Sequence, residues 1–293
     1  MVPKHTLGLV LVMLVTATGA SQSAELTKYC RFQVGDTVAY GMVEGQSVRQ
    51  LEGDLFGQWS KTDKTHALGD VTLLIPCEPS QVFAMAGNYR SHVAVIEDAA
   101  GKTSPASLEQ VPEKFRIPQP FHKSLSCLQP HQGHIVIPRN AGPVHYEAEM
   151  VIVIGRQATD VSKESALDHV FGVTCGNDVS ERGWQQGDVQ WWRAKGSDTF
   201  GPCGPFIVSG LDYDNLRIQL RQNGEVKQDA RTSELIHDVA TIVSYISQHV
   251  TLKPGDLIFT GTSGKTAEIK PGDMLEVELE GAGVLQNRVA ADK

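Results

Sequence analysis

Apolar residues alternate with polar ones over most of the chain, in short segments separated by Gly, Pro, Asn and Asp. This spacing of two is typical of β-strands with one buried face. The segments include "RFQVGDTVAYGMVEG", "GDVTLLIP", "GHIVIP", "HYEAEMVIVIG", "GPFIVSG", "LRIQLRQNGEVKQ", "DLIFTG" and "DMLEVELEG". Asn223-Gly224 separates two alternating runs and predicts a hairpin turn. The pattern predicts an α+β protein that is predominantly β.

The alternating segments fall into two groups. Residues 25–76 are expected to form a small β-rich N-terminal unit, and residues 80–293 the main domain. The stretch from Arg90 to Pro120 is polar and rich in Gly and Pro, which is typical of a mobile loop or lid. Apolar residues recur at helical spacing over 233–250, and the clearest helix is predicted there.

The N-terminus has a composition of its own. Lys4 and His5 precede the apolar run "LGLVLVMLVTA", and the small residues Thr18 and Ala20 suit cleavage after Ala20. Residues 1–20 therefore read as a secretory signal peptide, with a membrane anchor as the alternative. The run is well short of the roughly 20 apolar residues that a spanning helix needs. We expect a secreted or periplasmic protein that is free of the membrane after cleavage.

Charge and cysteine content narrow the possible partners. Lys and Arg number 26 against 34 Asp and Glu, a formal charge of −8, and no basic run is present. A nucleic-acid groove is therefore not expected, and an anionic substrate must be held by a few local cations. The five cysteines are odd in number, scattered and without a CxxC pair, which favours buried free thiols over disulfides.

The segment "HYEAEMVIVIG" places carboxylates where a core strand begins. In a strand, His145, Glu147 and Glu149 would share one face. That face could be solvated, or it could bind a cation. The continuous "VIVIG" that follows implies burial on both faces, where carboxylates need compensation. Asp178 lies after another apolar run and could join them, and three carboxylates suit Mg²⁺, Mn²⁺ or Ca²⁺ better than zinc or copper.

Three cations lie in aromatic or Gly-Pro surroundings: Lys123 in "PFHKS", Arg182 in "NDVSERGWQ" and Lys195 in "WWRAKGSDTFGPCGPF". Singly, each reads as a surface charge. Together they could converge on an anionic substrate.

Taken in order, these segments resemble the fumarylacetoacetate hydrolase family over about residues 82–289. The matching pieces are "GNYRSH", "PFHKS", "HYEAEMVIVIG", "GVTCGNDVSERGWQ", "KGSDTFGPCGPFIV", "NGEVKQ", "TLKPGDLIFTGTSG" and "KPGDMLEVELEGAGVLQN". The resemblance implies a mixed, barrel-like β-roll, a homodimer, and Mg²⁺ or Mn²⁺, with Ca²⁺ as a further possibility, bound by Glu147, Glu149 and Asp178.

The resemblance also implies an activity, the metal-dependent hydrolysis of a carbon–carbon bond in an acylpyruvate or related β-diketo acid through an enolate. His92 would activate the water, and Lys123 and Lys195 would hold or polarise substrate oxygens. Tyr89, Arg182, Gln185 and Thr262 would bind the substrate, a small carboxylate. His145 would lie in the pocket wall or behind the ligands.

One departure from the family pattern keeps other reactions open. Many relatives carry a Glu three residues after the histidine, and here that position is Val95. Glu97, Asp98 or Glu109 could replace it. Decarboxylation, isomerisation or hydration of a 2-oxo acid on the same metal is therefore the second hypothesis, and a non-catalytic exported binding protein is the third.

Overall fold

The computed structural model describes residues 26–96 and 107–292. The signal-peptide prediction for residues 1–20 lies outside the described residues, so export stays a prediction, as does the homodimer. The predominantly β architecture is confirmed, and its strands form sheets that do not close into a barrel.

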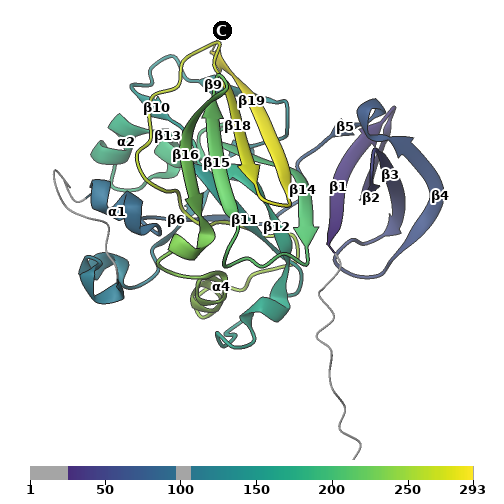
Figure 1. The fold of residues 1–293 in the computed structure, drawn as a ribbon, viewed down its shortest axis with the longest axis horizontal. Coiled ribbons are helices and arrows are strands. Elements are labelled where there is room, and N and C mark those ends of the chain that lie inside the picture. The colour runs from purple at the N-terminus through teal and green to yellow at the C-terminus, as the bar shows by residue number, and fades with distance from the viewer. Residues whose placement is uncertain (1–25, 97–106, 293) are drawn as a thin grey trace, which may run out of the picture.

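The first part of the chain forms an antiparallel meander at one side of the molecule (Figure 1). Its first four strands pair in succession, and the short fifth strand pairs with the first. The strands are β1 (Thr27–Val34), β2 (Thr37–Glu44), β3 (Ser47–Gly53), β4 (Trp59–Ala67) and β5 (Thr72–Leu73). Because β1 also pairs with β14 (Gly201–Ser209), the meander continues the main sheet.

The main sheet runs in the order β4-β3-β2-β1-β14-β12-β11-β17-β6-β7, with β8 paired to β14. Its other strands are β6 (Val82–Met85), β7 (Pro120–Lys123), β8 (Leu128–Gln129), β11 (Ala148–Ile154), β12 (Val170–Asn177) and β17 (Leu257–Phe259). Every residue of β11 is buried. The continuous apolar run after Glu149 therefore forms a central strand covered on both faces, as expected.

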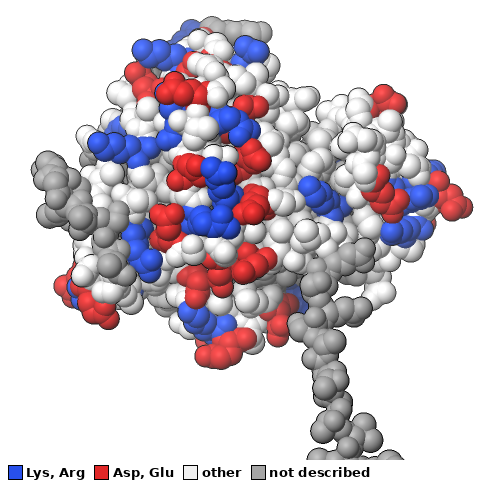
Figure 2. All heavy atoms as spheres, viewed as in Figure 1, with Lys and Arg blue, Asp and Glu red and all other residues white. Residues whose placement is uncertain are grey.

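A second sheet of five strands packs over β12 and β14. Its order is β16 (Glu225–Arg231), β15 (Arg217–Gln222), β18 (Met274–Leu279), β19 (Gly283–Ala291) and β9 (His134–Ile137). The predicted hairpin between β15 and β16 is present, with φ of 55° at Asn223 and 82° at Gly224. Lys, Arg, Asp and Glu cover the outer face of this sheet (Figure 2), where Arg221 pairs with Glu276 and Glu278. The small strands β10 (Val144–His145) and β13 (Ser180–Glu181) pair separately.

The helices are short: α1 (Arg90–Ile96), α2 (Arg182–Gly187), α3 (Trp192–Gly196) and α4 (Val239–Ser247). The remaining helical turns are of the 3-10 type, at Leu68–Asp70, Leu108–Gln110, Glu113–Phe115, Leu125–Cys127, Ala166–His169 and Thr232–Glu234. No helix of the described residues is long and apolar enough to cross a membrane.

The helix predicted over 233–250 begins later than expected, at Val239. The backbone N–H groups of Ile236 and His237 donate to Asn88 instead of to a helix. Asp238 then accepts from the N–H of Thr241 and caps the helix, which starts at Val239. Asn88, which is distant in sequence, therefore accepts the N–H groups that the start of the predicted helix would have used.

The polar segment after Tyr89 has order at both ends. It starts as α1, and its later part packs Val111 and Phe115 against Val93. Residues 97–106 lie outside the described residues. All five cysteines are buried and unpaired, as the sequence favours.

Gly87 allows Phe115 to pack close to the turn that precedes α1. Gly87 has φ of +60°, and a Cβ at this position would lie 2.3 Å from the Phe115 ring. We therefore expect Gly87→Ala to lower the free energy of unfolding by about 1–3 kcal/mol, through overpacking and backbone strain. Chemical denaturation measures the change. Gly69→Ala, where no atom lies within 4 Å, is the matched control and should differ little from wild type.

Candidate metal centre and active site

The segment that supplies the two glutamates is bent where a straight strand is expected. β10 ends at His145 and β11 begins at Ala148, so Tyr146 and Glu147 lie between two strands. In this break, the N–H of Glu147 donates to Asn177 Oδ1 at 2.8 Å, and the N–H of Asp178 donates to Glu147 O at 2.8 Å. These two bonds connect the start of β11 to the end of β12.

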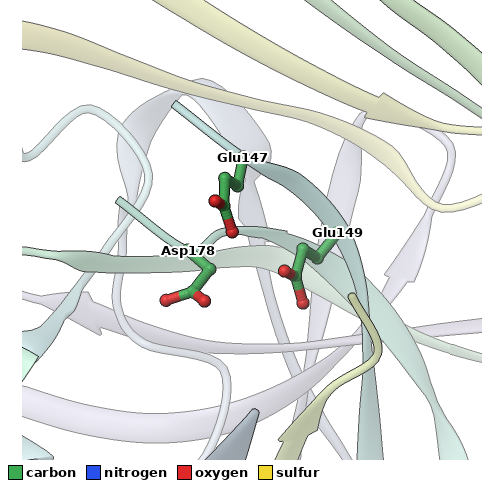
Figure 3. A group of neighbouring side chains, drawn as sticks. All are labelled: Glu147, Glu149 and Asp178. Atoms are coloured by element: carbon green, nitrogen blue, oxygen red, sulfur yellow. The ribbon is translucent and has the colours of Figure 1, made fainter. Parts of the chain in front are cut away.

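The break brings the three predicted acids together (Figure 3). One carboxylate oxygen each of Glu147, Glu149 and Asp178 lies within 4.8 Å of the others. The three residues are 4%, 1% and 1% exposed, respectively. They are therefore buried acids and do not form a solvated strand face.

Two of the three acids are paired with cations. Lys195 Nζ lies 2.7 Å from Glu147 Oε2 and 2.7 Å from Asp178 Oδ2. Arg182 Nη2 lies 2.7 Å from Glu147 Oε1. Burial alone would raise the pKa of Glu147, but the charges of Lys195 and Arg182 outweigh it and hold this pKa well below its usual range.

Lys123 is fully occupied by protein oxygens. Its Nζ donates to Asp178 Oδ1 at 2.6 Å, to Phe200 O at 3.2 Å and to Lys195 O. Burial opposes the charge of this ammonium, yet Asp178 raises its pKa above the usual value. Since an ammonium has three N–H donors, Lys123 has none left for a substrate oxygen. The structure places it behind Asp178, where it orients that acid.

Glu149 lacks such compensation. Its Oε2 accepts one hydrogen bond of 2.7 Å, from the N–H of Gly261, and no described Lys or Arg forms an ion pair with it. Burial raises the pKa of Glu149 well above its usual value, and the negative charges of Asp178 and Glu147 raise it further. A buried carboxyl group without a cation partner, in an all-oxygen donor set, fits a hard divalent cation, whose charge would stabilise the carboxylate form. Glu147, Glu149 and Asp178 would hold Mg²⁺, Mn²⁺ or Ca²⁺.

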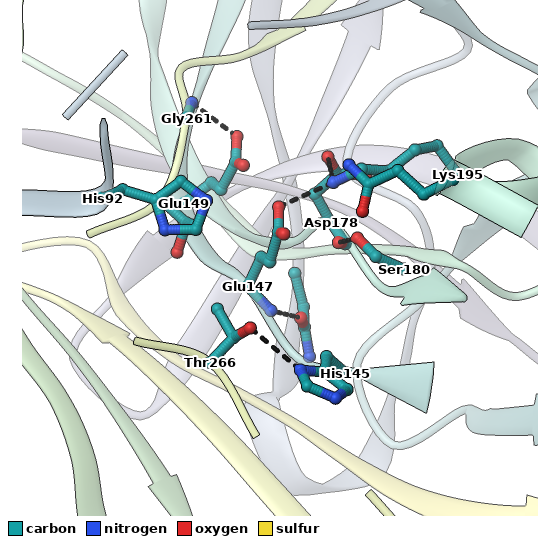
Figure 4. Close-up of polar contacts among 12 residues, drawn as sticks. His92, His145, Glu147, Glu149, Asp178, Ser180, Lys195, Gly261 and Thr266 are labelled. Carbon is teal, nitrogen blue, oxygen red and sulfur yellow. Dashed lines mark hydrogen bonds and ion pairs between the residues drawn. The ribbon is translucent and has the colours of Figure 1, made fainter. Parts of the chain in front are cut away.

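His92 lies on α1 close to this cluster (Figure 4). Its Nδ1 lies 2.7 Å from Gly264 O, and a carbonyl only accepts, so Nδ1 carries the proton. Burial lowers the pKa of His92 from its usual value, although the charge of Glu147 opposes this. The imidazole is therefore neutral near pH 7, with an unprotonated Nε2 that can accept a proton.

Arg182 also organises one wall of the site. It donates to Gln185 Oε1 at 2.7 Å and to Thr266 Oγ1 at 2.6 Å. His145 is half-buried and contacts the same Thr266 hydroxyl through Nδ1 at 3.0 Å. His145 therefore shares the Thr266 hydroxyl with Arg182 and is not part of the carboxylate cluster. Thr266 was not predicted, although it belongs to the "TGTSGKT" stretch.

Thr262 and Tyr89 occupy buried positions beside the glutamates. Thr262 Oγ1 donates to Ala148 O at 3.0 Å, so its hydroxyl hydrogen is not available to a substrate carboxylate. Tyr89 is buried, and its hydroxyl has no hydrogen-bond partner among the described residues. Burial raises the pKa of Tyr89, and the charge of Glu149 raises it further. The phenol therefore stays protonated and has a hydrogen to donate.

The position of the missing lid acid carries an exposed Val95. Of the proposed replacements, Glu109 is exposed, and Glu97 and Asp98 lie outside the described residues. Among the described residues, no carboxylate forms a hydrogen bond with His92, whose ring is held by the Gly264 carbonyl instead.

Comparison with known proteins identifies the family. A family model described as fumarylacetoacetate (FAA) hydrolase C-terminal matches residues 81–290. The chain belongs to the fumarylacetoacetate hydrolase family. A second model, described as Rv2993c-like, N-terminal, matches residues 27–76. The family resemblance inferred from the ordered motifs is thereby confirmed.

Three proteins illustrate the similarity of this chain to known proteins. Protein Rv2993c of Mycobacterium tuberculosis is 41% identical, with 87% of this chain and 94% of that protein covered. The bovine mitochondrial oxaloacetate tautomerase FAHD2A is 34% identical, with 75% and 70% covered. The structure of 2-hydroxyhepta-2,4-diene-1,7-dioate isomerase from Mycobacterium marinum superposes with a TM-score of 0.80 at 38% identity, covering 91% of this chain and 99% of that one.

The uncompensated charge of Glu149 predicts how metal affects stability. We expect Mn²⁺ at about 100 times its dissociation constant to stabilise the wild type by about 2.7 kcal/mol, and EDTA to reverse this. Glu149→Gln should remove the response, because it deletes the charge that lacks a cation partner. Thermal unfolding with elemental analysis measures both effects.

Glu276→Gln is the matched control, since Glu276 pairs with Arg221 on the outer sheet. It should retain the full metal response. A wild type that contains no metal and does not respond to Mn²⁺ would contradict the ligand assignment.

Proposed function

We propose that this protein is a Mg²⁺- or Mn²⁺-dependent enzyme that moves a proton at the carbon next to the carbonyl of a 2-oxo acid. The product is a tautomer or double-bond isomer. The observation that carries this proposal is the 2.7 Å contact between His92 Nδ1 and the Gly264 carbonyl, which leaves Nε2 of the neutral imidazole to accept a proton. Burial, which lowers the pKa of His92, favours that neutral form. An isomerisation requires one group that accepts a proton from one atom of the substrate and returns it to another atom.

The residues of the site divide this work. A bound divalent cation supplies a Lewis acid for the enolate oxygen. Lys195 keeps the carboxylates of Glu147 and Asp178 in place. Arg182, beside Glu147, carries a positive charge that would attract the carboxylate of the substrate. His92 Nε2 takes the proton from the substrate carbon, and the Tyr89 hydroxyl has a hydrogen for a developing negative charge.

The named relatives agree with proton transfer. The Mycobacterium marinum protein is called an isomerase, and the bovine protein is called an oxaloacetate tautomerase. Both names describe the movement of a proton and a double bond, without loss of a fragment. In relatives that carry a Glu at the position of Val95, the family resemblance implies that the Glu directs water. Its replacement by Val95 therefore favours proton transfer over hydrolysis.

Hydrolysis of a carbon–carbon bond in an acylpyruvate, the first expectation from the sequence, is the second candidate. An unprotonated His92 Nε2 can accept a proton from water as well as from carbon. The two reactions share the metal, the enolate and the cations. They differ in whether a water attacks the distal carbonyl and an acid is released.

His92→Ala tests the proposed base. We expect the rate of deuterium incorporation at C3 of oxaloacetate, followed by proton NMR with Mn²⁺-free Mg²⁺ buffer, to fall by about 10²–10⁴-fold. His134→Ala, an exposed histidine of β9, is the control and should match wild type.

Pyruvate release from acylpyruvates, measured in parallel, separates the second candidate from the first. Release at rates above those of exchange would overturn the proposal in favour of hydrolysis. Tight binding of a 2-oxo acid with neither exchange nor release would indicate a binding protein.

The protonation state of His92 predicts the acidic limb of the pH profile. Because burial lowers the pKa of His92, the neutral base persists to lower pH than an exposed histidine would. The kcat/KM for exchange should rise with pH through an apparent pKa below the ordinary histidine value and stay level above it. A midpoint above that value in the wild-type profile would contradict the assignment.

A further inference from the structure

Gln228 lies between residues 147–149, which carry the two glutamates, and the loop of residues 260–266. It belongs to β16 and is only 5% exposed. Its Oε1 accepts from the N–H of Ala148 at 2.9 Å. Its Nε2 donates to Thr262 Oγ1 at 2.9 Å and to Ser263 O at 2.6 Å. The orientation of the amide is determined, because an N–H lies on one side and a carbonyl on the other.

Both ends of the Gln228 amide bind segments that carry residues of the site. Ala148 lies between Glu147 and Glu149, so Gln228 is attached to the backbone that carries both ligands. On the loop side, Gly261 donates to Glu149 Oε2, and Gly264 accepts from His92 Nδ1. Gly264 also donates to Ser91 Oγ at 3.1 Å. One buried side chain therefore connects the carboxylates to the loop that orients His92.

We propose that Gln228 is a positioning residue for proton transfer. Its hydrogen bonds fix the distance between residues 262–264 and the start of β11. They thereby determine the position of the Gly264 carbonyl, which binds the imidazole of His92. This inference rests on the proposed function, in which His92 is the base. Proton transfer is sensitive to such placement, since a displacement of about 1 Å can lower a rate by about 10²-fold.

Gln is specifically suited to this position. Gln228→Glu would keep an acceptor for Ala148 but remove both donors, so a carboxylate oxygen would face the Ser263 carbonyl. Gln228→Asn would keep the amide chemistry but shorten it by one methylene, so that it could not reach both sides. The two substitutions disturb the loop by different means, and the second remains informative if the buried charge of the first prevents folding.

The experiment compares Gln228→Glu and Gln228→Asn with wild type in the metal-loaded protein. We expect kcat for C3 deuterium exchange to fall by about 10–100-fold. KM and the Mn²⁺ dissociation constant should stay within about threefold of wild type, because Glu147, Glu149 and Asp178 are unchanged. The ¹⁵N imidazole resonances of His92 should lose the Nδ1-protonated pattern. Gln46→Glu, an exposed residue of the N-terminal meander, controls for added charge.

The outcomes separate this inference from the proposed function. Unchanged kcat and an unchanged His92 ¹⁵N pattern in both variants would overturn the positioning role. Parallel losses of kcat and Mn²⁺ affinity would overturn it too, since Gln228 would then support the ligands. If wild type shows no exchange, the proposed function fails, while the Mg²⁺-loaded ¹⁵N spectra still decide whether Gln228 orients His92.

Discussion

The burial of three carboxylates at one point is the constraint on which the rest of the site depends. Isolated charges at this depth are strongly unfavourable, so each must have a partner. The partners come from separate parts of the chain: Lys123 from β7, Arg182 from α2 and Lys195 from α3. Their ion pairs with Glu147 and Asp178 connect these short segments to the start of β11 and the end of β12. The fold around the site is thus arranged by charge compensation as much as by apolar packing.

The sheet order explains how the acids and the loop meet. β11 lies between β12 and β17, so the start of β11 adjoins the end of one antiparallel neighbour and the exit of the other. Asp178 follows β12 at that end, and the loop of residues 260–266 follows β17. The same end of these strands therefore carries the metal ligands, the residues proposed to contact the substrate and the Gly264 carbonyl, which orients His92. Antiparallel pairing brings these strand ends together.

Sequence patterns predicted the strands, the hairpin and the three acids because those features depend on local alternation and on ordered motifs. They predicted less about what each polar group contacts. Lys123 was expected to reach the substrate, yet its three donors meet protein oxygens 55 to 77 residues away. The helix start was missed because Asn88 takes two donors from residues 236 and 237. Gln228 and Thr266 act through similar long-range bonds, which spacing does not reveal.

The negative charges of the three acids are not equally compensated by cations, and this difference makes the two sides of the site chemically distinct. Asp178 and Glu147 are held by ammonium and guanidinium groups, while Glu149 has one backbone N–H. Positive charge is therefore needed on the side of Glu149, where Gly261 begins the loop that leads to Gly264 and His92. A bound cation would be held by Glu147, Glu149 and Asp178 and would supply the positive charge that Glu149 lacks. Fixed cations therefore orient Glu147 and Asp178, while Glu149 is the acid left for a bound cation.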